Sequence, residues 1–198
     1  RADIAEAVID EVRRDLGDRE AAGLLATCPG PTVRRLLPEL RYAVANLASL
    51  ARRHPQALLD HLEAELRDLP PRRRDQLWAE VDAAVADLAL ADPGRVLGLV
   101  EEAGPSQVVP RGLRPVLGFL VRCAPSRVAA LVVDDEFVRS NRWHLPGGLR
   151  HNARRFSEAD RTAVATALRE HVDRFFEFLA ELPPGERATV FEHALADL

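Results

Sequence analysis

The chain has 198 residues, of which 47% are apolar and 29% are charged, and its net charge is −4. This length suits one domain with a sizeable core. The negative net charge argues against a general nucleic-acid-binding protein, which would carry a broad excess of basic residues. The sequence contains neither a membrane span of about 20 uncharged apolar residues nor a signal peptide pattern. We therefore expect a cytoplasmic protein whose two cysteines, Cys28 and Cys123, stay reduced.

The composition also indicates an origin. All 27 basic residues are arginine, and the sequence has no methionine, even at position 1. Because an initiator methionine is not normally removed ahead of arginine, we expect the sequence to be a piece of a longer protein. The preference for arginine, alanine, glycine and proline is typical of a GC-rich bacterial genome. Part of the arginine content therefore reflects codon usage and not selection for phosphate binding.

Apolar residues recur every three or four positions along most of the chain, which predicts helices, and no segment alternates convincingly like a strand. The predicted helices, in chain order, cover 3–16, 19–27, a short helix before Pro38, 38–53, 55–68, 72–91, 93–103, 106–123 with a kink at Pro110 or Pro115, 125–133, 158–181 and 186–197. Ser157-Glu158-Ala159-Asp160 resembles a capping box. Trp78 lies in an apolar stripe, so we expect it in the core. The motif LPPxxR, at 69–74 and 182–187, is expected at turns between helices.

One segment occurs three times, and its copies align without a gap on Pro55, Pro93 and Pro125. Apolar residues stand eight and five positions before each proline and three and seven positions after it. Proline suits the first turn of a helix and disfavours the α conformation in the residue before it. Each copy therefore predicts a helix that ends, a tight corner and a second helix that starts. Such a hairpin buries both apolar stripes only by stacking on the next hairpin.

The segment LRYAVANLASLARRHPQALLDHL at 40–62 resembles the second helix of a HEAT or armadillo-like repeat running into the first helix of the next repeat. LRPVLGFLVRCAP at 113–125 repeats it. The resemblance covers about residues 40–135 and implies an all-α fold, a HEAT-like α-α superhelix or solenoid of stacked helical hairpins. By similarity, such solenoids most often bind other proteins through a curved surface. We therefore expect a single α-helical repeat domain over 1–198.

Residues 134–156 interrupt this pattern, and we expect a short helix, a loop and another short helix there. The irregular stretch at 137–156 contains five arginines and no acidic residue. Arginine suits phosphate or carboxylate, and tryptophan can stack on a base. The stretch is therefore either an anion or nucleic-acid patch, or a solvated insertion whose arginines pair with the acidic helix over 158–181. The candidate binding residues are Arg139, Arg142, Trp143, His144, Arg150, His151, Arg154 and Arg155.

Motifs for catalysis or for a cofactor are missing: the sequence has no GxSxG, P-loop, GxGxxG or HExxH. His61 and Glu65 share one helix face, but two ligands do not make a zinc site, so we expect no metal and no cofactor. Cys123 lies in an apolar helix and is interpreted as a buried structural thiol. The acidic run at 134–136 is interpreted as a solvated helix start, because adjacent residues on a helix do not face each other.

The first functional hypothesis is a non-catalytic protein-interaction or scaffold module, which binds a protein partner or another domain of the same chain. The second is a nucleic-acid-binding HEAT-like domain, of the DNA-glycosylase type. Some DNA glycosylases are similar solenoids that hold damaged DNA on a basic concave face with tryptophans and an acid. Trp143, Asp134 and Asp135 are the candidates here for such a site. A third option is an anion or nucleotide sensor at 137–156.

The charge of equivalent positions separates these hypotheses. A nucleic-acid binder should carry arginine at the same position of several copies. Arg41 and Arg114 match as the second residue of the two LR segments, although they stand fourteen and eleven residues before their prolines, and the middle copy has Asp82 eleven residues before Pro93. The interrupted stripe favours the protein-interaction hypothesis.

Overall fold

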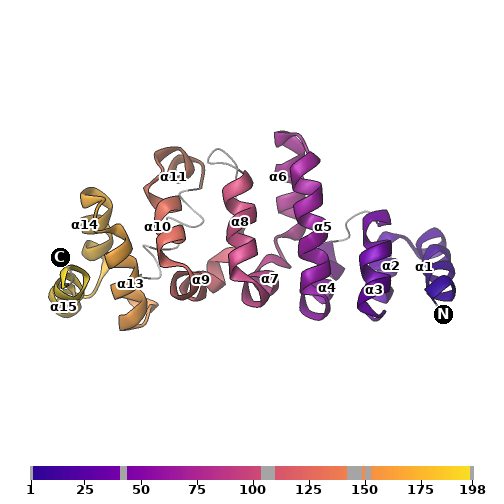
Figure 1. Ribbon diagram of the computed structural model, residues 1–198, viewed down its shortest axis with the longest axis horizontal. Coiled ribbons are helices and arrows are strands. Elements are labelled where there is room, and N and C mark those ends of the chain that lie inside the picture. The colour runs from indigo at the N-terminus through magenta and orange to yellow at the C-terminus, as the bar shows by residue number, and fades with distance from the viewer. Residues whose placement is uncertain (1, 41–43, 104–109, 142–148, 150–152, 197–198) are drawn as a thin grey trace. The chain divides into compact units, whose positions relative to one another are not determined.

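The computed structural model describes residues 2–40, 44–103, 110–141, 149 and 153–196. Within them the protein is all α-helical, without strands (Figure 1). The chain divides into two compact units, residues 1–99 and 100–198. In the described part of the chain, no helix is both long and apolar enough to cross a membrane. The prediction of an all-α protein is confirmed.

The helices follow the predicted order closely. The first unit contains α1 (Ala2–Leu16), α2 (Asp18–Leu25), α3 (Gly30–Leu36), the 3-10 turn η1 (Leu37–Glu39), α4 (Val44–Arg53), α5 (Pro55–Asp68), α6 (Pro71–Val81), α7 (Val85–Ala91) and the start of α8 (Pro93–Ala103). The second unit contains the end of α8, η2 (Arg111–Val116), α9 (Leu117–Cys123), α10 (Pro125–Val133), α11 (Asp135–Asn141), η3 (Ala153–Arg155), α13 (Glu158–Leu168), α14 (Val172–Glu181) and α15 (Pro184–Leu195). Both bounds are as predicted for α5, α8 and α10, the three helices that start with the repeated prolines.

The three proline corners share one backbone geometry. The residue before proline has φ/ψ of −138°/52° at His54, −150°/84° at Asp92 and −152°/63° at Ala124. Each of these residues donates its N–H to the carbonyl four residues earlier and accepts an N–H from four residues later, with N···O distances of 2.7–3.2 Å. The chain therefore changes direction at one residue, and that residue keeps one helical hydrogen bond on each side. At Asp92 the side chain also caps α8, because Oδ1 accepts the N–H of Arg95 at 3.1 Å.

The apolar positions of the repeated segment form the cores of the two units. All twelve positions aligned on the prolines are buried: Leu47, Leu50, Leu58, Leu62, Val85, Leu88, Val96, Val100, Leu117, Leu120, Val128 and Val132. Burial of one such side chain contributes about 1.5–3 kcal/mol relative to exposure. Trp78 is 2% exposed, which confirms its predicted place in the core. The pattern that divides the chain into helices therefore also supplies part of the core of each unit.

Four of the longer predicted helices are wrong in their extent. The helix predicted over 38–53 starts later, because Leu40 is extended after η1, and 41–43 lie outside the described residues. The helix predicted over 72–91 is broken by a turn at 82–84, and most of the kinked segment before α9 is the 3-10 helix η2. The helix predicted over 158–181 is broken at 169–171, although its capping box at Ser157 and Asp160 is confirmed.

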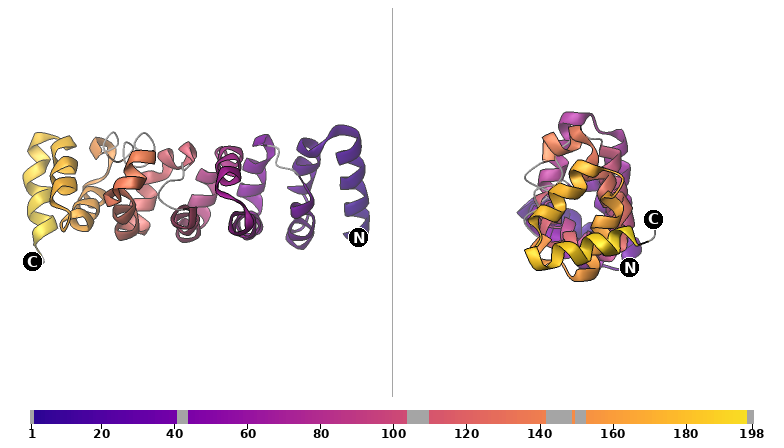
Figure 2. Two further views of the ribbon diagram at one scale, coloured as in Figure 1. Left: turned by 90° about the horizontal axis from the view of Figure 1, so that it is seen from above. Right: turned by 90° about the vertical axis from the view of Figure 1, so that its left-hand side faces the viewer.

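The break before α14 is a fourth corner without a proline. His171 has φ/ψ of −110°/76°, and its carbonyl accepts the N–H of Phe175 at 2.9 Å. Aligned on Val172 in place of proline, the positions eight before, three after and seven after are the buried Val164, Phe175 and Leu179. The apolar stripe runs through the break without a gap, so its periodicity gives no sign of the corner. On the two sides of the break, α13 packs on α9, α10 and α15, and α14 packs on α15 and η3 (Figures 1 and 2).

The LPPxxR motif forms the same hydrogen-bonded turn in each unit. The Nε of Arg74 donates to the carbonyl of Leu69 at 2.9 Å, and the Nε of Arg187 donates to the carbonyl of Leu182 at the same distance. Arg187 also donates from Nη2 to the carbonyl of Ala180 at 2.6 Å. Helix ends leave carbonyls without helical partners, and these arginines satisfy them. The motif therefore joins the end of one helix to the start of the next.

Cys123 is exposed, so its interpretation as a buried structural thiol is wrong. It is the last residue of α9, and the buried stripe of that helix passes through Leu117, Leu120 and Val121. The sequence around Cys123 is apolar, but the position itself turns away from the stripe just before the corner. Local hydrophobicity was a poor guide here because a helix end has neighbours on fewer sides.

His61 is a buried histidine in the middle of α5, with 8% of its surface exposed. Burial lowers the pKa of its imidazole, and nearby Glu65 opposes that shift. The folded first unit therefore favours the neutral imidazole.

Replacement of Arg187 by alanine should lower the free energy of unfolding by about 1–2 kcal/mol, because two helix-end carbonyls lose a charged donor. Denaturant unfolding followed by circular dichroism measures this loss. Arg139→Ala is the matched control, since Arg139 is an exposed arginine of the same unit. Equal stability of the two variants would contradict a structural role for the motif.

Acidification should destabilise the first unit through His61. The unfolded imidazole, with a pKa of about 6.5, binds a proton that the folded one resists. The free energy of unfolding should therefore fall as the pH drops below about 6.5. This decrease in the free energy of unfolding should be smaller in the His61→Asn variant. The control variant His193→Asn, changed at an exposed position, should show the same decrease as the wild type. Unfolding curves at pH 7.5 and pH 5.5 measure the difference, and an unchanged fall in His61→Asn would rule the explanation out.

Candidate binding groove

The structure describes only part of the predicted anion-binding set. Arg139 is exposed on α11, and Arg154 is exposed on η3. Arg154 donates from Nε to the carbonyl of Glu181 at 3.3 Å, at the end of α14. The side chain of Arg155 is outside the described residues. So are the other members of the set, namely Arg142, Trp143, His144, Arg150 and His151.

A buried arginine holds η3 against α13. Arg161 is 8% exposed and donates from Nε to the carbonyl of Ala153 at 2.9 Å and from Nη2 to the carbonyl of Arg154 at 2.8 Å. Its Nη1 pairs with Glu186 of α15. This arginine therefore joins three elements of the second unit. Its role, like that of Arg154, is to satisfy backbone carbonyls inside the fold.

The acidic run at 134–136 starts a helix, as interpreted from the sequence. The Oδ1 of Asp134 accepts the N–H of Phe137 at 2.8 Å, so Asp134 caps α11. Trp143 and the side chain of Asp135, the other candidates for a glycosylase-type site, lie outside the described residues. Among the residues that the structure does describe, no cluster of histidine, cysteine, aspartate or glutamate is arranged to hold a metal ion.

Arginines at equivalent positions form regular ion pairs between neighbouring helices. Arg95 lies two residues after Pro93, and Glu63 lies eight residues after Pro55. The guanidinium of Arg95 grips both carboxylate oxygens of Glu63 through Nε and Nη2, at 2.7 Å each. Its Nη2 also donates to Asp60 at 2.8 Å. The hydrogen bond that Arg95 donates to Glu63 is the main reason that the pKa of Arg95 is raised above its ordinary value.

The next copy repeats this pairing. Arg127 lies two residues after Pro125 and grips Glu101, eight residues after Pro93, through the same Nε and Nη2 edge at 2.8 and 2.6 Å. The hydrogen bond that Arg127 donates to Glu101 raises the pKa of Arg127. Two-point arginine–carboxylate contacts of this kind fix geometry as well as charge. We call the pairs Arg95–Glu63 and Arg127–Glu101 the arginine ladder.

The ladder changes at the fourth corner. Arg174 lies two residues after Val172, the position that Arg95 and Arg127 occupy in their helices. The residue eight positions after Pro125 is Val133, which has no carboxylate. Arg174 instead contacts a carboxylate of its own helix: Nη1 lies 3.1 Å from Oε2 of Glu177. The arginine of the ladder is thus present at the fourth corner, but at the position of the ladder glutamate α10 has Val133.

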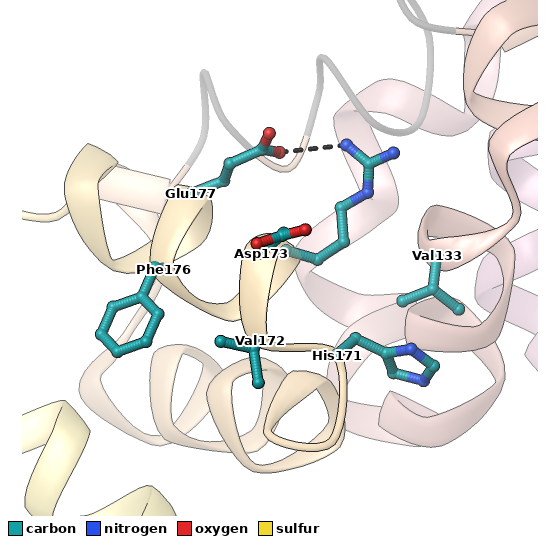
Figure 3. A pocket seen from close by; sticks show the side chains of 7 residues that line it. Val133, His171, Val172, Asp173, Phe176 and Glu177 are labelled. Atoms are coloured by element: carbon teal, nitrogen blue, oxygen red, sulfur yellow. Dashed lines mark hydrogen bonds and ion pairs between the residues drawn. The ribbon is translucent and has the colours of Figure 1, made fainter.

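An open groove lies where this glutamate is missing (Figure 3). It has a volume of about 810 Å³ and lies between the end of α10 and the first turns of α14. Its lining residues are Val133, His171, Val172, Asp173, Arg174, Phe176 and Glu177. Val172 is 61% exposed and Phe176 is 54% exposed. Val172 and Phe176 therefore present exposed apolar surface at this groove.

Aromatic side chains extend the apolar surface from the groove onto α15. The buried Phe175 meets Phe176 edge to face at a centroid distance of 5.5 Å. Phe176 stacks on Phe191 of α15 at 6.4 Å, and Phe191 is 36% exposed. Rings held by other rings lose little freedom when a partner covers them. The cluster therefore provides a preformed apolar surface.

Known proteins do not identify the chain: it matches no family model, no curated protein and no solved structure. The groove itself is the basis for inferring a function.

Sequence reasoning missed the groove, because the repeated segment was aligned on proline. The residues 164–179, VATALREHVDRFFEFL, fit the same spacing at three of the four positions when Val172 replaces proline, and the fourth is the half-buried Ala167. Arginine and histidine at Arg169 and His171 also match Arg52 and His54 of the first copy. A search for the apolar spacing alone would have found the fourth copy.

The ladder predicts a modest, salt-sensitive contribution to stability. Glu101→Gln removes one carboxylate of a half-exposed pair, so we expect a loss of about 0.5–1 kcal/mol at low salt and less at 1 M salt. Denaturant unfolding of the wild type, Glu101→Gln, Arg127→Gln and the double variant measures the coupling. Losses that simply add in the double variant would show that the pair contributes nothing.

Proposed function

We propose that the protein is a non-catalytic interaction module that binds a segment of a protein partner, or of another domain of the same protein, in the groove between α10 and α14. The observation that carries the proposal is the exposure of Val172 and Phe176 in a concave site. Interfaces concentrate aromatic anchors in such hollows, with charged groups at the rim. Asp173, Arg174 and Glu177 provide that rim.

We further propose that the architecture is a HEAT-like solenoid of stacked helical hairpins, in a cytoplasmic bacterial protein. Three corners of one geometry, at His54, Asp92 and Ala124, support a repeat. The corner at His171 is related: its φ/ψ is similar, but its N–H donates to the carbonyl three residues earlier instead of four. The ladder supports it as well, because its arginines and glutamates recur at fixed distances from the corner. In such folds each hairpin contacts its neighbours in turn.

The nucleic-acid alternative has less support. Besides the ladder, two arginines that stand three residues before a corner proline are also paired with carboxylates. Arg52 lies 3.0 Å from Asp87, and Arg122 lies 3.4 Å from Asp160. A nucleic-acid surface needs arginines directed at phosphates, and these four are directed at acids of their own chain.

Selection of peptides from a random display library tests the function. Peptides that bind the wild type should bind Val172→Ser/Phe176→Ser at least about tenfold more weakly, because the double variant removes the apolar anchors. Leu90→Ser is the matched control, since Leu90 is another exposed apolar side chain, 53% exposed, in the first unit. Fluorescence anisotropy with labelled peptides measures the affinities. Binding that is equal in the groove variant and in the control would refute the groove as the binding site.

A further inference from the structure

The proposed function leaves open which chemistry the groove recognises, and the arginine ladder addresses this. On the basis of that function, we infer that the groove selects an acidic and apolar segment of a protein partner. Such a segment offers a glutamate or aspartate carboxylate to Arg174 and an apolar side chain to Val172 and Phe176. The bound carboxylate takes the place that Glu63 takes at Arg95 and Glu101 takes at Arg127.

Equivalent position is the first argument. Arg95, Arg127 and Arg174 each lie two residues after the start of their helix at a corner of the same kind. In the first two cases the helix that starts at the previous corner presents a glutamate, and the arginine binds it through Nε and Nη2. At the third arginine, Arg174, the corresponding residue is Val133 at the end of α10, and the groove lies there. A partner carboxylate entering the groove reaches the guanidinium from the side on which the ladder glutamates stand.

The capacity of the guanidinium is the second argument, because Arg174 already contacts Glu177. Arg95 shows that an arginine at this position holds more than one carboxylate, since it binds Glu63 and Asp60 together. Arg174 contacts Glu177 through Nη1. By the example of Arg95, such a contact does not preclude a second carboxylate at the same guanidinium.

The apolar walls supply the anchor that a charge pair alone lacks. A surface ion pair contributes little by itself, because both charges are well hydrated. A partner side chain that covers Val172 and Phe176 excludes water from the pair and strengthens it. Recognition therefore requires both elements in one segment: an apolar residue and an acid close to it.

The other charges at the groove set a direction for one further variant. Asp173 and Glu177 are carboxylates at the rim, and His171 lines the floor next to Val172. Asp173 repels an acidic partner and attracts a basic one. Asp173→Asn should therefore tighten an acidic segment by about two- to fivefold. A basic segment in the groove would respond in the opposite direction.

The test uses the peptides selected from the random library on the full chain. We expect groove-dependent peptides to share glutamate or aspartate close to an apolar residue. Their affinity should fall about tenfold in Arg174→Gln and should fall equally when the peptide acid is changed to its amide. The two changes together should cost little more than either alone. Arg139→Gln makes the same charge change on α11 and should leave the affinity unaltered.

A second variant supplies the missing carboxylate from the chain itself. Val133→Glu places a glutamate where the ladder has one, so it should compete with the acidic peptide and weaken binding by about tenfold. Val133→Gln has the same size without the charge and should weaken binding much less. These variants need no change at Arg174, so they remain informative if Arg174→Gln folds poorly.

The outcomes separate this inference from the proposed function. Peptides that depend on Val172 and Phe176 but contain no acid, or that are indifferent to Arg174→Gln, would overturn the carboxylate inference and leave the groove as a binding site. A library that yields no groove-dependent peptide would overturn both. Peptides rich in arginine and lysine that weaken in Asp173→Asn would show that the groove takes a basic segment instead.

Discussion

The restriction that proline places on the residue before it is the constraint on which both units depend. Because the pyrrolidine ring disfavours the α conformation there, the chain leaves one helix axis and enters another within a single residue. Hydrogen bonds continue on both sides of His54, Asp92 and Ala124, so the corner disrupts little of the helices it joins. Each corner also fixes the register of the helix that follows. Positions at a given distance from proline therefore become structurally equivalent.

The arginine ladder is a consequence of that register. A side chain two residues after one corner proline meets a side chain eight residues after the corner proline before it, as Arg95 meets Glu63 and Arg127 meets Glu101. The pairs are partly exposed, so they contribute modestly to stability. Their larger effect is specificity, since a two-point arginine–carboxylate contact accepts few other alignments of the two helices. Where valine replaces the glutamate, the same register leaves an arginine beside an open apolar hollow.

Much of this organisation was predictable from the sequence where a local rule determines the outcome. Proline fixed the starts of α5, α8 and α10 to the residue, and apolar spacing identified the buried side of each helix. The break at His171 was not predictable in the same way. Its apolar stripe is continuous, and α13 packs on α9, α10 and α15, which are segments that the local sequence does not reveal. The prediction that Cys123 is buried was wrong for a related reason, because burial at a helix end depends on distant segments.

The binding groove was beyond the sequence reading for a further reason. Arg174 and Val133 are ordinary residues in their local contexts, and neither forms a motif with its neighbours. They become informative only when the fourth corner is aligned with the other three, which the missing proline conceals. The basic stretch at 137–156 drew attention instead because its composition is unusual. Composition reports what a segment contains, whereas the groove depends on which helix faces which.

The corner at His171 differs from the others in how it is maintained. Val172 leaves the α region open to His171, so a straight helix through this segment is a competing conformation that the proline corners do not have. Its bend is maintained by the burial of Phe175 and Leu179 on one side and of Val164 on the other. Local opening should therefore cost less free energy here than at a proline corner. A partner that covers Val172 and Phe176 favours the bent conformation and, by the same thermodynamic linkage, makes this part of the second unit more rigid.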